Sequence, residues 1–408
     1  MKTDVAKNSR PLKVLQIPSW YPPEGGAFCQ KQALFLRQAG IHIDILANLQ
    51  LPWRKHGLNA LRFKRKPFVS KEGELLVYRY YQLRVPRCEK TNVNRWLSKT
   101  MQLADHYIKE NGKPDIIHAH TSLWAGYAAC LIKEKHQIPY VLTEHHSILG
   151  HPSLHTKKEC KDWYDDYLFK SFSNADFILP VGSLQVERIK QYIRSGKANI
   201  QVLSNTIDVS LFSYKDRVRR KKFVFSAIND FAYYKAYDIL LPAFDIVYEN
   251  NPDIELHIAG DGFQSKAFKE IAGKCKHADK IKYLGCLSAS EVRNQLWESD
   301  SLVLPSRSES QSISVLEALS TGIPVVCTEV VPPETVGSNE GYRVPIEDVN
   351  SLAEAMLRME KTINQFDAGA ISSHTQSKVN KESFVEKTKA IYRHVINEYQ
   401  NDEQRISL

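Results

Sequence analysis

Short apolar runs alternate with amphipathic helical stretches from residue 12 onward. The first run, LKVLQIP (12–18), precedes a helical pattern over 28–38, which Gly40 ends, and a second apolar run follows at 41–47. Such alternation is typical of βα units built around a parallel sheet. The pattern of the first half predicts strands at 12–18, 41–47, 115–120, 139–145, 175–181 and 200–204, and helices at 28–38, 97–108, 123–135, 160–173 and 184–194.

The alternation lapses in the polar and basic stretch SYKDRVRRKK (213–222) and then restarts. This break predicts two α/β domains, at 12–206 and 207–372, followed by a helical segment at 373–408. Open parallel sheets bind ligands beyond the carboxyl ends of their strands, so two domains facing one another predict an interdomain site. The pattern of the second half predicts strands at 223–228, 254–260, 280–285, 301–306 and 324–328, and helices at 237–249, 264–275, 289–297, 311–321 and 380–399.

The composition is that of an ordinary globular protein and excludes collagen-like and disordered classes. The 408 residues are 43% hydrophobic and 25% charged. No apolar run approaches the roughly 18 residues of a membrane-spanning helix, and the start, MKTDVAKNSRPLK, lacks the apolar stretch of a signal peptide. We therefore expect a cytoplasmic protein. The seven cysteines contain no CxxC pair, which favours reduced thiols and predicts no structural metal.

Positive charge is densest in the segment 53–66, where six Lys and Arg residues are interleaved with Trp53, Leu58, Leu61 and Phe63. Basic residues with apolar anchors are typical of segments that bind an anionic membrane surface, here the inner face. A solvated loop is an equally good interpretation. Nucleic-acid binding is not expected, because no helix-turn-helix, zinc-finger or RNP-type signature accompanies the charge.

The most informative segment is SRSESQSISVLEALSTGIPVV (306–326), in which Glu309 precedes a predicted helix and Glu317 lies on it. The start of a helix offers unpaired backbone N–H groups and a partial positive charge, which suit a phosphate. Glu317 could accept hydrogen bonds from sugar hydroxyls. The alternative is an ordinary helix with a serine N-cap and two surface glutamates.

Other candidate groups follow predicted strands. Lys235 lies several residues after the strand 223–228, where a lysine can meet a phosphate as a point charge. Neither a GxGxxG dinucleotide fingerprint nor a P-loop is present, so a phosphate ligand would have to be bound by other groups. In the first half, Gly25 and Gly26 follow the first strand, and further polar residues close two later strands, namely His118, His120, Glu144, His145 and His146. These histidines lack a third metal ligand with convincing spacing, and no GxSxG hydrolase motif occurs.

In this order the motifs resemble those of family 4 of the retaining glycosyltransferases, enzymes of the GT-B architecture. The resemblance runs along almost the whole chain and rests on six features. They are Gly25-Gly26, the histidine motifs DIIHAH (115–120) and TEH (143–145), the hinge motif SNTIDVSLF (204–212), Lys235, AGDG (259–262), and Glu309 with Glu317.

The resemblance implies two Rossmann-like, doubly wound domains facing an interdomain cleft, with the C-terminal helix crossing back to the first domain. A nucleotide-diphosphate sugar would be the donor and a lipid-linked saccharide the acceptor, with no metal or other cofactor. Lys235 would hold the diphosphate with the backbone of Ser310, Gln311, Ser312 and Ile313. Glu309 would contact the donor sugar and Glu317 the ribose. His120 would lie near the sugar ring, and Gly25 and Gly26 near the diphosphate. Leu287 would frame the base, and Glu144 and His145 would lie on the acceptor side.

Two departures from the family pattern leave alternatives open. Asn229 stands where many members carry an arginine that meets the diphosphate, and Arg307 or a lysine of the first domain is a candidate substitute. The stretch between the glutamates is rich in serine where the family has glycine, and Ala236 replaces a glycine after Lys235. The alternatives are a non-catalytic GT-B scaffold that binds a sugar or nucleotide, and another GT-B enzyme such as a sugar-nucleotide epimerase.

Overall fold

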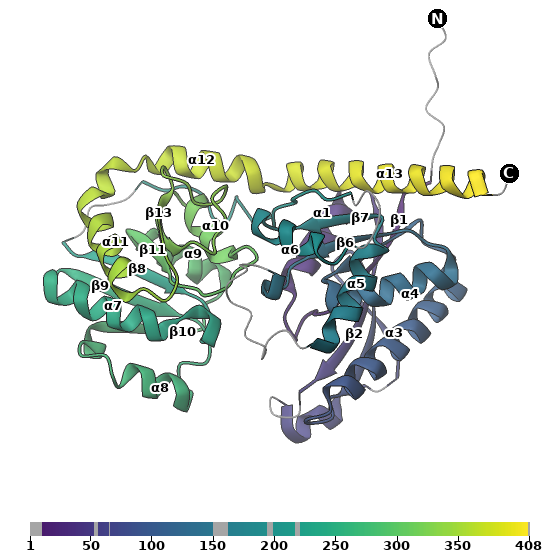
Figure 1. The fold of residues 1–408 in the computed structure, drawn as a ribbon, viewed down its shortest axis with the longest axis horizontal. Helices are drawn as coiled ribbons and strands as arrows, with labels where there is room; N and C mark the ends of the chain where they lie inside the picture. The colour runs from purple at the N-terminus through teal and green to yellow at the C-terminus, as the bar shows by residue number, and fades with distance from the viewer. Residues whose placement is uncertain are drawn as a thin grey trace, which may run out of the picture.

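The protein was analysed as a computed structural model that describes residues 10–52, 56–64, 66–149, 162–193, 199–216 and 221–406. Figure 1 shows two α/β domains side by side, with the C-terminal helices running along one edge of both. The predicted architecture of two Rossmann-like domains is confirmed.

The first domain contains a seven-stranded sheet with the order β3-β4-β2-β1-β5-β6-β7, parallel except for the β3–β4 pair. Its inner strands are almost wholly buried because helices cover both faces, which is why they are continuous apolar runs. The strands are β1 (Lys13–Pro18), β2 (His42–Leu51), β3 (Phe68–Glu72), β4 (Leu75–Leu83), β5 (Ile116–His120), β6 (Tyr140–Glu144) and β7 (Phe177–Pro180), and the helices are α1 (Ala27–Gln38), α3 (Glu89–Asn111), α4 (Tyr127–His136), α5 (Asp165–Ser173) and α6 (Val186–Lys190).

Two features of the first domain differ from the sequence prediction. The β3–β4 hairpin was missed, because burial alternates along both strands, β3 at the sheet edge and β4 beside it, and their apolar runs are weak. The predicted strand 200–204 was wrong, since only an isolated bridge joins Ile200 to Ile178. The segment continues instead as an extended connection toward the second domain.

The second domain contains a six-stranded parallel sheet with the order β10-β9-β8-β11-β12-β13. The prediction missed its edge strand β13 and the helices α11 and α12. The strands are β8 (Phe223–Ile228), β9 (Ile254–Ala259), β10 (Ile281–Gly285), β11 (Ser301–Leu304), β12 (Val325–Thr328) and β13 (Gly341–Val344), and the helices are α7 (Tyr237–Asn250), α8 (Lys266–Ala272), α9 (Ala289–Trp297), α10 (Ile313–Ser320), α11 (Val349–Thr362) and α12 (Ala368–Val379).

The last helix, α13 (Lys381–Ile406), returns to the first domain (Figure 1). Phe384, Tyr392 and Val395 on this helix are buried in the same apolar cluster as Val14 and Ile43 of the first sheet. The predicted boundary at 372/373 falls inside α12, so the change of domain occurs at the junction of α12 and α13. No helix in the described ranges has the length and apolarity that a bilayer span requires.

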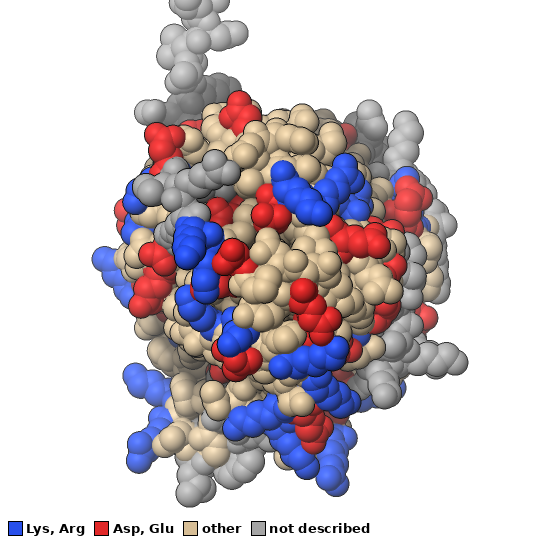
Figure 2. All heavy atoms as spheres, turned by 90° about the vertical axis from the view of Figure 1, so that its left-hand side faces the viewer, with Lys and Arg blue, Asp and Glu red and all other residues tan. Residues whose placement is uncertain are grey.

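The basic segment 53–66 is described only in part. Trp53, Arg54, Lys55 and Arg65 lie outside the described residues. The remainder contains a 3-10 helix, Gly57–Arg62, with Arg62 and Lys64 exposed and Phe63 packed against Tyr81. On the opposite side of the molecule, the outer face of the second domain carries Lys and Arg interspersed with Asp and Glu (Figure 2), so opposite charges lie close together there.

Candidate functional site

Lys235 and Glu309 meet in the second domain. Lys235 follows β8 on a short 3-10 helix, Glu309 follows β11, and the lysine Nζ lies 2.6 Å from Glu309 Oε1. Ser306 donates a second hydrogen bond to the same carboxylate oxygen at 2.7 Å. The two charged side chains are only 14% and 8% exposed. This buried ion pair, neutral as a pair, places an ammonium and a carboxylate where two βα loops converge.

The beginning of α10 lies a few residues beyond Glu309. Its N-cap, Ser312, makes no side-chain capping bond, and its hydroxyl instead pairs with that of Ser314 at 3.0 Å. The first-turn N–H groups are therefore left uncapped by this residue and carry the partial positive charge of the helix start. Further along, burial raises the pKa of Glu317 to about 7, while the ammonium of Lys31 in the first domain acts in the opposite direction.

The loop between β11 and α10 is pressed against the first domain. Ser308 donates a hydrogen bond to the backbone oxygen of Ser147, and Ser310 donates one to that of His145, both at 2.8 Å. A Cβ atom on Gly182 would stand 2.4 Å from the backbone oxygen of Ser310. The serines of this stretch thus connect the two domains, and Gly182 permits their close approach.

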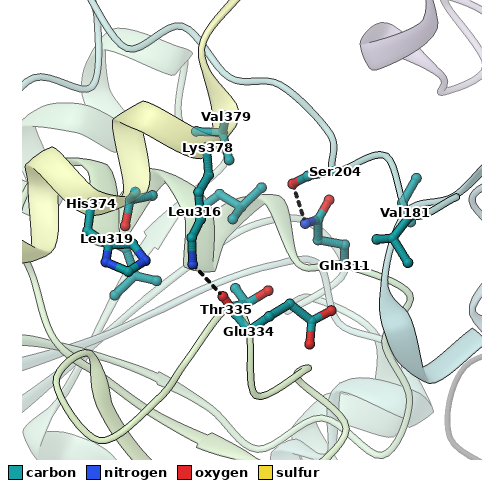
Figure 3. Close-up of a pocket in the computed structure, with 12 residues that line it drawn as sticks. Val181, Ser204, Gln311, Leu316, Leu319, Glu334, Thr335, His374, Lys378 and Val379 are labelled. Carbon is teal, nitrogen blue, oxygen red and sulfur yellow. Dashed lines mark hydrogen bonds between the residues drawn. The ribbon is translucent and has the colours of Figure 1, made fainter. Parts of the chain in front are cut away.

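Gln311 joins the same loop to the interdomain connection. It accepts a hydrogen bond from the backbone N–H of Asn205 and donates one to the hydroxyl of Ser204, both at 2.6 Å. Figure 3 shows Gln311 beside a cavity of about 140 Å³, into which Leu316 of α10 and Val379 of α12 also point. Gln311, which was predicted to bind the donor, therefore belongs to the loop between β11 and α10 and also contacts the connection between the two domains.

Three histidines are gathered at the carboxyl ends of β5 and β6. The ring of His118 stacks on that of His120 with centroids 4.3 Å apart, and His120 Nδ1 lies 3.0 Å from His145 Nε2. Burial lowers the pKa of His118 and of His145 to about 3 and that of His120 well below its ordinary value. All three imidazoles are therefore neutral at pH 7.

The C-terminal helix supports this cluster. The hydroxyl of Tyr392 lies 2.6 Å from His118 Nδ1, and the hydroxyl of Thr143 lies 2.7 Å from the other ring nitrogen. Glu144 is buried, and its two carboxylate oxygens accept hydrogen bonds from the backbone N–H groups of Ser122 and His146. Glu144 thus holds the loops after β5 and β6, a role that its position in the sequence did not indicate.

Several buried polar side-chain atoms in the described part of the chain have no hydrogen-bond partner. Among them are His120 Nε2 and Asn229 Oδ1. Buried polar groups are almost always satisfied in native proteins, so such atoms mark places where a ligand is expected. One atom lies in each domain, His120 Nε2 at the end of β5 and Asn229 Oδ1 directly after β8.

The glycine turn after β1 is also a site of close approach. Gly26 has a φ of 70°, and a Cβ there would stand 2.1 Å from the backbone oxygen of Trp20. Only glycine fits this position. Leu287 lies half-buried in the connection between β10 and α9, at the edge of the second sheet.

Two family models match successive parts of the chain. A model described as Glycosyltransferase Family 4 matches residues 32–211, and one described as Glycosyl transferases group 1 matches residues 220–361. The chain belongs to this glycosyltransferase family.

Individual relatives of this group 1 glycosyltransferase are themselves named as glycosyltransferases. The TuaC glycosyltransferase of Bacillus subtilis (strain 168), whose name places it in teichuronic acid biosynthesis, is 27% identical over 86% of this chain and 89% of its own. The UDP-Gal:alpha-D-GlcNAc-diphosphoundecaprenol alpha-1,3-galactosyltransferase of Escherichia coli is 25% identical over 62% of this chain and 68% of its own. The solved sucrose-phosphate synthase of Thermosynechococcus elongatus superposes with a TM-score of 0.79 over 94% of this chain and 99% of its own at 16% identity, which shows a shared fold.

Arg307 is not free to replace the arginine that many glycosyltransferases of this family have at the position of Asn229. Its guanidinium pairs with Asp238 at 2.7 Å and with Glu347, and it is 4% exposed. Two carboxylates therefore already neutralise this charge. The candidate from the first domain, Lys31, lies 3.9 Å from Asp208.

Ala236 occupies a strained position in this glycosyltransferase, at the start of α7. Its φ of 52° and ψ of 46° lie in the left-handed region, where a Cβ atom costs roughly 1 to 2 kcal/mol. Glycine avoids this cost but loses about 0.5 to 1 kcal/mol through the entropy of the unfolded chain. We therefore expect Ala236→Gly to stabilise the second domain by about 0.5 to 1 kcal/mol. Urea unfolding of the two proteins measures this difference, and a destabilised variant would contradict the expectation.

Proposed function

We propose that the protein is a retaining glycosyltransferase that moves a hexose from a nucleotide-diphosphate sugar to a lipid-linked saccharide without the help of a metal ion. One observation carries the proposal, namely the buried Lys235–Glu309 pair beside the uncapped start of α10. Through Ser310 and His145, the same loop reaches His120 of the other domain.

In this function the second domain neutralises the leaving group. As the glycosidic bond breaks, negative charge grows on the diphosphate, and Lys235 together with the N–H groups of Ser312 to Ser314 would stabilise it. The Lys235–Glu309 pair would then open toward the phosphate, with Ser306 still bonded to the carboxylate. Fixed positive charge of this kind supplies what a metal ion supplies in other transferases.

The environment of Glu309 supports retention without a covalent intermediate. One of its carboxylate oxygens already accepts hydrogen bonds from both Lys235 and Ser306, which lowers its nucleophilicity. The leaving phosphate would instead take the proton of the acceptor as the acceptor attacks the same face of the sugar. The neutral His120, with its unpartnered Nε2, would accept or donate a hydrogen bond at a sugar hydroxyl.

The proposed acceptor is lipid-linked, as the name of the Escherichia coli relative states for that protein. We place the reaction at the cytoplasmic face of the membrane, with the basic segment 53–66 against anionic lipid. Co-sedimentation with vesicles containing anionic phospholipid should decrease when salt is raised and when Phe63 is replaced by Ser. Binding that is insensitive to both changes would assign this segment to a loop without membrane contact.

A ligand panel tests the function. Purified protein with EDTA is heated with UDP, GDP, ADP, dTDP or CMP and their common sugar conjugates. A ligand at 100 times its Kd stabilises the native state by about 2.7 kcal/mol, which is a shift of at least a few degrees in Tm. We expect one base to respond and its sugar conjugate to be consumed when a lipid-linked acceptor is added. Binding without transfer to any acceptor would favour a non-catalytic scaffold, consistent with the loss of an arginine at Asn229.

A further inference from the structure

A cysteine lies against the histidine cluster. Cys29, in the first turn of α1, is buried, and its thiol together with ring nitrogens of His120 and His145 forms a group of potential ligand atoms that all lie within 4.8 Å of one another. No third ligand for these histidines is apparent from the sequence, because Cys29 is about ninety residues away from His120 along the chain. The fold brings it there by placing α1 directly after β1, which is the neighbour of β5 in the sheet.

The geometry of this group is close to that of a zinc site. Zinc–sulfur and zinc–nitrogen bonds of 2.3 and 2.0–2.1 Å place tetrahedral ligand atoms roughly 3.3 to 3.6 Å apart. His120 Nδ1 and His145 Nε2 are 3.0 Å apart, and a contraction of about 1 Å would bring the most distant pair within bonding range. Three protein ligands leave a fourth position open, as in zinc sites that also hold water.

The surroundings hold the three ligands in place. Phe28 packs against the His145 ring with centroids 4.3 Å apart, and His118 stacks on His120. Gln16 donates a hydrogen bond to the backbone oxygen of Cys29 at 3.1 Å. Neighbours of this kind orient metal ligands and increase metal affinity.

We propose that Cys29, His120 and His145 form an inhibitory site for Zn²⁺. Binding replaces the thiol proton of Cys29, which leaves to solvent, by a zinc–sulfur bond. The proton shared between His120 Nδ1 and His145 Nε2 moves to the other nitrogen of the ring that carries it, so that both facing nitrogens donate lone pairs to the ion. Thiolate and imidazole ligands favour zinc over Mg²⁺ or Mn²⁺, which prefer oxygen. The inhibition rests on the proposed function, since a zinc ion bound to His120 places a divalent positive charge beside the sugar ring, where positive charge develops as the glycosidic bond breaks. The metal site itself does not.

Cobalt titration tests the site independently of activity. Co²⁺ bound to a thiolate gives a near-ultraviolet charge-transfer band, and we expect this band to saturate at one Co²⁺ per chain and to disappear when Zn²⁺ is added. Loss of a residue that only hydrogen-bonds to a metal ligand reduces metal affinity by roughly 10- to 100-fold. Because Cys29 would be a ligand itself, Cys29→Ala should raise the Kd for Co²⁺ by more than about 100-fold. Cys29→Ser, which preserves size, should also abolish the band. The control is Cys88→Ala at an exposed cysteine, which should keep it.

Activity then separates this proposal from the proposed function. Zn²⁺ should suppress sugar transfer by the native protein and by Cys88→Ala, EDTA should restore it, and Cys29→Ala should transfer sugar equally with and without zinc. A cobalt band that persists in both Cys29 variants, or that never forms, overturns the site. A stoichiometric band in a protein that transfers no sugar supports the site and refutes the proposed function.

Discussion

Sugar transfer by Lys235→Ala is expected to be at least 100-fold slower than by the native protein, on the order of the loss seen when one fixed donor to a developing negative charge is removed. Lys235 is the buried cation beside the start of α10, and Arg307 cannot replace it because two carboxylates hold it. Initial rates at saturating donor measure the effect. Lys276→Ala is the matched control, because this exposed lysine pairs with Glu249 at the surface of the same domain and should transfer sugar at the native rate.

Stability must be separated from catalysis in this experiment. Removing one partner of a buried ion pair leaves the other charge without compensation and costs about 3 to 5 kcal/mol at most sites. The double variant Lys235→Met with Glu309→Gln removes both charges, so we expect it to recover most of the lost unfolding free energy and none of the activity. Full transfer by Lys235→Ala, or by the double variant, would refute the role of this pair.

The second large effect is a loss of stability in mild acid. His118, His120, His145 and His146 are buried with lowered pKa values, because burial disfavours their charged forms. In the unfolded chain they take up protons below about pH 6.5, so the unfolded state binds more protons and stability decreases as the pH falls. From pH 7 to pH 5 each of them costs about 2 kcal/mol.

Glu317 acts in the opposite direction. Burial raises its pKa to about 7 in the folded protein, so its contribution to stability is complete at low pH and is lost as the pH rises through about 7. From pH 7 to pH 5 this carboxyl regains about 2 kcal/mol. The four histidines and Glu317 together should therefore reduce the unfolding free energy by about 5 to 6 kcal/mol.

Urea unfolding of the native protein and of Glu317→Gln at pH 7, 6 and 5 tests both contributions. The variant lacks the opposing carboxyl, so its unfolding free energy should fall by about 2 kcal/mol more than that of the native protein over this range. A native protein equally stable at pH 7 and pH 5 would contradict the assignment of neutral histidines. Parallel curves for the two proteins would contradict the raised pKa of Glu317.

The sequence was most informative where the sheet is buried on both faces. The inner strands are continuous apolar runs, and the loops that follow β8 and β11, which carry Lys235 and Glu309, could be located from them. The strands that were missed, namely the edge strands β3 and β13 and the strand β4 next to β3, have partly exposed faces and no such runs. In a parallel sheet, strands that are buried on both faces are thus easier to predict from the sequence than strands with an exposed face.

Contacts between segments that are far apart in the chain could not be predicted from the sequence. In the sequence, Gly182 looks like an ordinary turn residue. The structure shows why glycine is needed there, because a Cβ atom would stand 2.4 Å from the backbone oxygen of Ser310. Tyr392 lies 274 positions from His118, the histidine it supports, and no pattern within α13 points to that pairing. Likewise, Arg307 was a reasonable candidate for a phosphate until the structure showed its two carboxylate partners.

The return of α13 to the first domain also has a consequence for synthesis on the ribosome. The core around β1 and β2 includes Phe384, Tyr392 and Val395, so this core is incomplete until almost the entire chain has been translated. The core of the second domain needs α11 and α12, up to Val379, but nothing from α13, so it is complete earlier. Domains usually fold in the order in which they are made. Here the domain that begins first is completed last, and a nascent chain exposes the apolar side of α1 throughout elongation.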